Sequence, residues 1–226
     1  MRRHARAGMA LATALAGVAD VVPAQRAEPA VVLPVAGAAL AFPFDSLTSR
    51  WLASPPVATA PGVPALAAIG RRTGDVGALA AGPVTWLAGA IGDDPALRGT
   101  GRDVGRSVLL ALATTTAIKV LAGRTRPDAT ADGSPRHWRW LAGLRDEGRR
   151  SFPSGHASLS TAAAVSLAWG LRTGGDHGWR DAAALGAYAL AGTAILSRVR
   201  DRRHWLSDVL AGAALGTASA LVVRGR

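Results

Sequence analysis

A histidine and an aspartate, His204 and Asp208, stand four residues apart where the last apolar segment begins. At helical spacing the two side chains share a face, so the Asp208 carboxylate is expected to accept the Nδ1–H of His204. That contact would fix the imidazole tautomer and leave Nε2 unprotonated, as a nucleophile requires. A surface His–Asp pair at the mouth of a helix is the simpler alternative. It leaves unexplained why Asp208 interrupts an apolar segment.

A second block, Ser151 to His156, immediately precedes another apolar segment. Gly155 allows a close backbone approach, Ser154 offers a hydroxyl, and the start of a helix presents unpaired N–H groups to an anion. Ordinary N-capping by Ser154 is the alternative. Capping accounts for the serine but not for His156, so the block is interpreted as an anion site with a titratable neighbour.

A third block combines Lys119 with Arg126 and Pro127. Lys119 falls in the last turn of an apolar segment, where the helix dipole favours a cation, and Pro127 keeps Arg126 out of the helix. A snorkelling lysine and a solvated arginine would also fit. However, Lys119 is the only lysine in a chain rich in arginine. That usage indicates a site that needs a compact ammonium group.

Together and in this order, the blocks resemble the phosphatidic acid phosphatase type 2 / vanadium haloperoxidase superfamily. The signature of that family is K-x6-R-P, then P-S-G-H, then S-R-x5-H-x3-D. Its fixed positions are filled here by Lys119, Arg126, Pro127, Pro153, Ser154, Gly155, His156, Ser197, Arg198, His204 and Asp208. The first hundred residues carry no comparable match, so they say little about the substrate.

The resemblance implies a role for each site residue. His204 would attack phosphorus to form a phosphohistidine, Asp208 would orient it, and His156 would protonate the leaving oxygen and then activate water. The phosphoryl oxygens would be held by the remaining residues of the site, namely Lys119, Arg126, Ser154, Gly155 and Arg198. Fixed cations and N–H donors suit the charge of phosphoryl transfer, and the chain has no acidic cluster typical of a magnesium site.

The sequence therefore predicts a phosphoric ester hydrolase that needs no metal or other cofactor. Its expected substrate is a phosphate monoester or pyrophosphate, lipid-linked or a small soluble ester. Vanadate mimics the phosphorane, so it is expected as an inhibitor, and a vanadium-dependent haloperoxidase is the alternative enzyme. A non-catalytic membrane protein that binds anionic lipid is the alternative from another class, but it would not need His156, His204 and Asp208 in register.

The elements that must position these residues are predicted to be helices. Hydrophobic residues make up 49% of the 226 residues, chiefly Ala, Leu and Val, and no useful period-2 alternation occurs. This favours an all-α protein with a single bundle of about five to six helices and the active site at the helix ends on one face. The expected helices are Asp75–Ile91, Gly105–Ala122, His156–Arg172, Arg180–Ser197 and Trp205–Val223, with an apolar segment at Val31–Phe42 and irregular or short helical structure at Asp45–Pro64.

The charge and the N-terminus bear on partners and location. The net charge is +11 but the arginines are scattered, which argues against nucleic acid and for an anionic substrate or lipid. Residues 1–24 are predicted to be an export signal, or an uncleaved anchor, ahead of a phosphatase domain at 25–226. The protein is expected in a bacterial-type cell envelope, either in the inner membrane with its site facing the periplasm or soluble in the periplasm. Cysteine is absent, which excludes disulfides and thiolate chemistry.

Two questions stay open at this level. The loop Thr125–Ser151 contains Trp138 and Trp140, which could contact an acyl chain or the membrane interface, or simply pack the loop down. The oligomeric state is not predicted.

Overall fold

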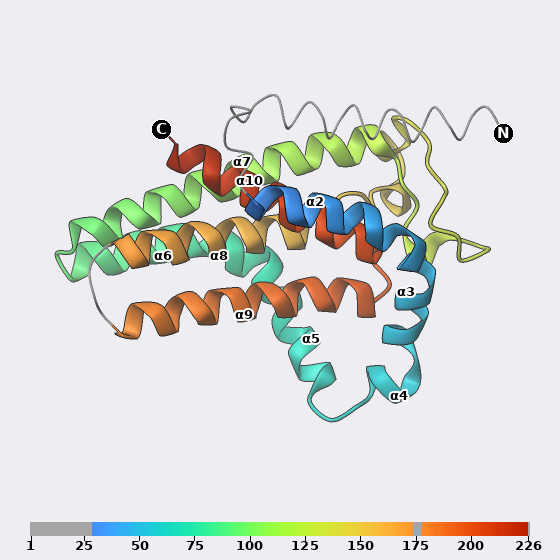
Figure 1. Cartoon of the computed structure of the whole chain (residues 1–226), viewed down its shortest axis with the longest axis horizontal. Helices are drawn as coiled ribbons and strands as arrows, with labels where there is room; N and C mark the ends of the chain where they lie inside the picture. The colour runs from blue at the N-terminus through green and yellow to red at the C-terminus, as the bar shows by residue number, and fades with distance from the viewer. Residues whose placement is uncertain (1–28, 174–177, 226) are drawn as a thin grey trace.

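The computed structural model describes residues 29–173 and 178–225, which form an all-α bundle (Figure 1). The predicted export signal at 1–24 lies outside the described residues. The helices are α2 (Pro29–Ala41), α3 (Asp45–Ala53), α4 (Pro55–Ala58), α5 (Val63–Arg72), α6 (Ala78–Ile91), α7 (Pro95–Ala122), α8 (Gly155–Thr173), α9 (Gly178–Arg200) and α10 (Leu206–Arg224). Within these ranges no strand forms, and the all-α prediction is confirmed. The Pro-rich segment expected to be irregular or short helical supplies α3 and α4.

Helix α8 lies at the centre of the bundle and packs against α7, α9 and α10. Small residues let the helix backbones approach closely, since a Cβ placed on Gly216 would lie 2.2 Å from the carbonyl oxygen of Ser158. Between α7 and α8 the core is filled by Val104, Val108 and Leu159, with alanines around them. These Ala- and Gly-rich helices thus bury little side-chain volume, but their close packing fixes the relative positions of α7, α8, α9 and α10.

Helix α7 begins at Pro95, well before the expected Gly105. The carboxylate of Asp94 accepts the N–H of Leu97 at 2.9 Å, and Pro95 occupies the first helical position. The helix ends at Gly123, whose φ of 57° is left-handed and whose added Cβ would meet the carbonyl oxygen of Arg139. This tight exit places Lys119 in the last turn and sends the chain into the loop of residues 124–154.

That loop is ordered by backbone contacts without forming a strand. The N–H of Thr125 donates to the carbonyl of His137 at 2.9 Å, and the N–H of Ser151 donates to the carbonyl of Arg124 at 3.0 Å. Trp138 packs the loop down, with its ring centroid 5.4 Å from that of Phe152, whereas Trp140 is exposed. Packing of the loop thus accounts for Trp138, whereas contact of Trp140 with an acyl chain or the membrane interface stays a prediction.

Helices α5 and α6 are joined by a π-helical turn, Thr73–Gly77. Gly74 in this turn is buried against His156, because a Cβ added to it would lie 2.8 Å from Cδ2 of the imidazole. Single π-turns in helices are frequent at functional sites. The helix expected at Asp75–Ile91 is present and continues through Pro83.

Four helical segments of the described chain are long and apolar enough to cross a membrane: Val31–Ala53, Pro95–Ala122, Gly178–Arg200 and Leu206–Arg224. Large apolar side chains, among them Leu109, Leu185 and Leu196, are exposed on α7 and α9. Such extensive apolar exposure is typical of a surface covered by lipid. Length and exposure together support an integral membrane protein over a soluble bundle.

Candidate active site

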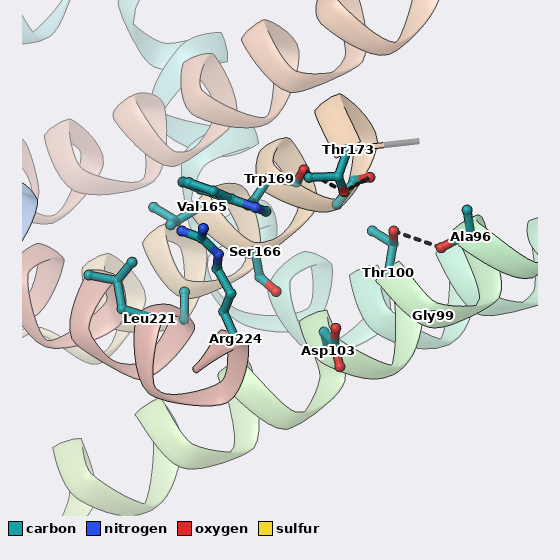
Figure 2. A pocket seen from close by; sticks show the side chains of 12 residues that line it. Ala96, Gly99, Thr100, Asp103, Val165, Ser166, Trp169, Thr173, Leu221 and Arg224 are labelled. Carbon is teal, nitrogen blue, oxygen red and sulfur yellow. Dashed lines mark hydrogen bonds between the residues drawn. The ribbon is translucent and has the colours of Figure 1, made fainter. Parts of the chain in front are cut away.

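All three sequence blocks meet at one end of the bundle. The C-terminal ends of α7 and α9 and the N-terminal ends of α8 and α10 lie there, together with α3 and the loop 124–154 (Figure 1). The opposite end holds a cavity of about 340 Å³ between α7, α8 and α10 (Figure 2). It is lined by Thr100, Asp103, Ser166, Trp169, Thr173 and Arg224, among others, and none of the predicted site residues lines it.

His204 is buried in the short loop before α10, and its Nδ1 lies 2.6 Å from the carbonyl oxygen of Ser151. A carbonyl can only accept, so Nδ1 carries the proton and Nε2 keeps its lone pair. The expected direct bond to Asp208 is wrong, because Oδ2 of Asp208 lies 3.8 Å from Nδ1. The reason is that α10 starts only at Leu206, so His204 and Asp208 do not share a helical face.

Asp208 instead holds the backbone around His204. Its carboxylate accepts from Ser151 Oγ at 2.5 Å and from the N–H of Trp205 at 2.9 Å, and it forms an ion pair with Arg124. One carboxylate therefore fixes both Ser151, whose carbonyl contacts the imidazole, and Trp205, which follows His204 in the sequence. The carboxylate of Asp208 is thus connected to His204 through these two residues.

The surroundings of His204 keep it neutral. Burial lowers the pKa of His204 to about 3, the positive charge of Lys119 adds to that shift, and the carboxylate of Asp208 opposes it. At neutral pH the imidazole is unprotonated, as a nucleophile must be.

The second block forms the start of α8. The N–H of Ser154 donates to the carbonyl of Asp208 at 2.9 Å, and Ser154 Oγ lies 3.5 Å from the N–H of Ala157, a long capping contact. A Cβ added to Gly155 would lie 3.6 Å from Cε of Lys119, so the lysine runs beside the helix start. The first N–H groups of α8 have no intrahelical acceptor and face this cation-rich end.

His156 is half-buried on α8, next to the π-helical turn. Burial lowers the pKa of His156 to about 4, and Arg198 and Lys119 lower it further, while Asp75 opposes the shift. The charges of Lys119 and Arg198 act on both histidines. The two imidazoles therefore share one cationic environment.

Two of the cations lack partners. Lys119 Nζ donates to the carbonyl of Arg150 at 2.8 Å, but the buried Nε of Arg126 and that of Arg198 have no hydrogen-bond acceptor. Among the described residues, no ion pair reaches either guanidinium group. Arg180 and Arg200 also have an unpaired Nε, but their terminal nitrogens are bound to Asp94 and Asp201, respectively. Arg126 and Arg198 are thus charged groups with unused hydrogen-bond donors.

Two buried residues connected to the site were not identified from the sequence. Arg124 and Asp45 are fully buried, and they form ion pairs that connect Asp208 to helix α3. Arg124 lies inside the third block, between Lys119 and Arg126, but a second arginine in a basic loop gives no signal of burial. Asp45 lies among aromatic and proline residues far from any block, and nothing in the sequence marks it. In the described ranges, no group of three or more His, Asp or Glu residues is placed to hold a metal ion.

These features define a class of site: a buried, neutral histidine at helix ends, facing arginines that lack anionic partners. Residues 101–225, more than half of the chain, match the PAP2 superfamily, and the chain belongs to that superfamily. The resemblance noted from the sequence is thereby confirmed. The helices α2 to α6 precede the matched region.

Individual relatives are distant. The chain is 36% identical to a lipid A 1-phosphatase of Porphyromonas gingivalis over 44% of this chain and 18% of that protein. It is 42% identical to a putative phosphatidate phosphatase of Drosophila melanogaster over 36% of this chain and 23% of the relative. It is also 34% identical to a probable diacylglycerol pyrophosphate phosphatase of Schizosaccharomyces pombe, over 47% and 45% of the respective chains. The matches span less than half of each relative, and no solved structure matches the chain.

Proposed function

We propose that this protein is a metal-independent phosphatase that hydrolyses a phosphate monoester or pyrophosphate through a phosphohistidine intermediate. The carrying observation is His204, whose Nδ1 is held by the Ser151 carbonyl at 2.6 Å, so that the Nε2 lone pair is left for the substrate. Family membership supports the same chemistry.

The phosphoryl group would be bound by the cations and donors around His204. Arg126 and Arg198 supply buried Nε–H groups without partners, and Lys119 adds an ammonium group. The hydroxyl of Ser154 and the N–H of Gly155 at the start of α8 complete this phosphate-binding group. Phosphoryl transfer builds charge on the equatorial oxygens, so fixed positive groups supply most of the stabilisation.

The reaction would proceed in two half-reactions. In the first, His204 Nε2 bonds to phosphorus, the P–O bond to the leaving group breaks, and His156 gives its proton to the leaving oxygen. In the second, His156 takes a proton from water, the oxygen of water bonds to phosphorus, and the P–N bond breaks. Free phosphate and the alcohol, or the shorter phosphate, are released, and both histidines return to their starting states.

The acid role of His156 depends on the bound substrate. The pKa of His156 is lowered to about 4 by burial and neighbouring cations, so the free protein holds it mostly neutral at pH 7. A phosphate dianion brings two negative charges into the site and neutralises Lys119 and Arg198, which raises the pKa of the imidazole. Protonation of His156 would therefore accompany substrate binding, and the site favours a mildly acidic optimum.

The substrate would be lipid-linked. Four helices are long and apolar enough to cross a membrane, and such crossings would bring the end of the bundle that holds His204 near a membrane surface. The relatives are named for lipid A 1-phosphate, phosphatidate and diacylglycerol pyrophosphate, which are all phosphates attached to lipids. These names favour a phosphatase over the haloperoxidase and the non-catalytic lipid-binding alternatives.

We also propose that residues 1–24 direct export and that the catalytic end lies on the outer side of an inner membrane. Because the chain has no cysteine, single cysteines report this directly. A membrane-impermeant maleimide applied to spheroplasts is expected to label Ala131→Cys in the loop and not Arg172→Cys at the other end. Labelling of Arg172→Cys alone would show that the protein has the opposite orientation in the membrane.

The test of the chemistry uses the full chain in detergent with short-chain phosphatidate and EDTA. Wild type is expected to release phosphate, and His204→Ala is expected to lose about 10³-fold or more in kcat. With ³²P-labelled substrate, wild type should carry an acid-labile, alkali-stable label that His204→Ala lacks. His137→Ala is the matched control, since the His137 side chain is exposed and forms hydrogen bonds only with Asp132. An active His204→Ala variant would refute the mechanism.

A further inference from the structure

Arg124 is a fully buried cation between two carboxylates. Its Nη2 bonds to Asp45 Oδ2 at 2.6 Å, and its Nη1 bonds to Asp208 and, at 2.8 Å, to Ser207 Oγ. Its Nε donates to the carbonyl of Pro135 at 3.1 Å. Aromatic rings surround the guanidinium, with centroids 4.8 to 5.7 Å from it; they belong to Phe42, Trp138 and Trp205. Only the planar guanidinium group of arginine presents donors in the fixed directions that these contacts require.

Asp45 reaches this cation from outside the region that matches the family. It is the first residue of α3, it is fully buried, and it lies well before residue 101. Its Oδ1 accepts the N–H of Ser207 at 2.8 Å, and its Oδ2 accepts the hydroxyl of Ser207 at 2.6 Å besides Arg124. Every hydrogen bond of the Asp45 carboxylate is with a donor, and these donors, Arg124 above all, favour its ionised form.

From Asp208 the connections continue to the nucleophile. Asp208 Oδ2 accepts the hydroxyl of Ser151 at 2.5 Å, and the carbonyl of Ser151 accepts the Nδ1–H of His204 at 2.6 Å. The path from α3 to the imidazole thus runs through Asp45, Arg124, Asp208 and Ser151, and each member is buried.

The charges along this path act on the imidazole together with those of Lys119 and Arg198. Two ionised carboxylates and one guanidinium sum to one negative charge close to His204. When His204 bonds to phosphorus through Nε2 while Nδ1 keeps its proton, the ring becomes cationic, and a nearby negative charge stabilises it. Without Asp45, Arg124 would pair with Asp208 alone, and the path would contribute no net negative charge against the cations Lys119 and Arg198.

We infer that Asp45 is a positioning residue for the nucleophile: through Arg124 it fixes Asp208 and leaves one net negative charge beside His204. This inference rests on the phosphatase chemistry proposed above. It assigns part of the catalytic site to helix α3, which lies outside the matched family region.

The first experiment replaces Asp45 by asparagine in the full chain. Asn can still accept the Ser207 N–H, so the shape is kept and the charge is lost. We expect kcat to fall about 10- to 100-fold with KM within about threefold, as for other partners that orient a functional histidine. The inhibition constant of vanadate, which bonds to Nε2, should rise about tenfold, while that of inorganic phosphate, which needs only the cations, should stay unchanged.

Asp94→Asn is the matched control. Asp94 also pairs with a buried arginine, Arg180, at 2.9 Å, but at the far end of the bundle. Its replacement should lower the unfolding temperature without changing kcat or vanadate inhibition. If Asp45→Asn likewise changes only the unfolding temperature, Asp45 merely attaches α3 to the bundle and the inference is overturned. Loss of the proposed function is a separate outcome, seen as an active His204→Ala variant.

A second pair of variants covers the case in which Asp45→Asn does not fold. Arg124→Gln leaves Asp45 and Asp208 as two buried carboxylates without a cation, whereas Arg124→Gln with Asp45→Asn restores a single negative charge. The double variant should unfold about 2–4 °C or more above Arg124→Gln alone. Equal or lower stability of the double variant would contradict a shared charge balance.

Discussion

The two halves of the chain contribute to the site in different ways. The matched half, α7 to α10, carries the proposed nucleophile, the proposed acid and the proposed phosphate-binding cations, and α8 and α10 are buried along most of their length. The preceding half, α2 to α6, exposes large apolar residues such as Leu40, Trp51 and Ile91. Its buried positions are mostly small or polar, among them Asp45, Gly70 and Gly74.

Two of these small and polar positions are connected to the histidines. Asp45 is connected to His204 through Arg124 in the inference above, and Gly74 lies directly against His156. In this proposal the first half positions groups that the second half supplies. Variants at site residues of the second half should therefore cause the larger losses in kcat. Variants in the first half should lower kcat less and leave the binding of inorganic phosphate unchanged.

After replacement of His204 itself, the largest effect is expected for Arg198→Ala in the matched half. Arg198 is half-buried with an unpaired Nε, so its loss removes a donor from the phosphoryl oxygens. We expect kcat to fall about 10²- to 10³-fold, the range for loss of one preorganised donor. Steady-state hydrolysis of short-chain phosphatidate measures it. Arg202→Ala is the control, since Arg202 is exposed and donates to the Pro127 carbonyl at 3.0 Å. Equal losses in both variants would mean that general positive charge, rather than a specific contact, binds the substrate.

An intermediate effect is expected for Gly74→Ala in the first half. Its Cβ would lie 2.8 Å from His156 Cδ2 and 3.0 Å from the Cβ of Ala194, so the imidazole must move. A misplaced acid lowers kcat by about 10- to 100-fold without weakening inhibition by inorganic phosphate. Gly186→Ala, which has nothing within 4 Å, should leave kcat unchanged and slightly raise the unfolding temperature. Unchanged kcat in Gly74→Ala would show that α5 and α6 do not position His156.

This division also explains what the sequence could predict. The blocks around Lys119, Ser154 and His204 were found because chemistry demands particular residue types at fixed spacing. The Ala- and Leu-rich segments predicted the bundle. The predicted start of α7, Gly105, lies after the true start at Pro95 because Arg and Asp residues in the first turns obscure the apolar pattern.

Long-range contacts could not be predicted in the same way. The bond from His204 to the Ser151 carbonyl involves a backbone atom, which no side-chain pattern records. Asp45 is separated from Arg124 by 79 residues, and Gly74 contacts His156 only because the π-turn brings it there. Such contacts depend on how helices pack, and a single sequence carries no local signal for them.

The smallest effect is expected for Asp75→Asn, which tests the first half by charge alone. Asp75 raises the pKa of His156 against the larger lowering by burial and Arg198. Its removal therefore lowers that pKa, so the protonated acid is lost at a lower pH and the alkaline limb of the kcat profile moves toward acid. Because Asp75 is exposed, screening limits the move to about 0.2–0.5 pH unit, and 0.5 M salt should reduce the difference. Asp103→Asn, at the other end of the bundle, should leave the profile in place. A move toward alkaline pH would mean that Asp75 does not act on His156 by its charge.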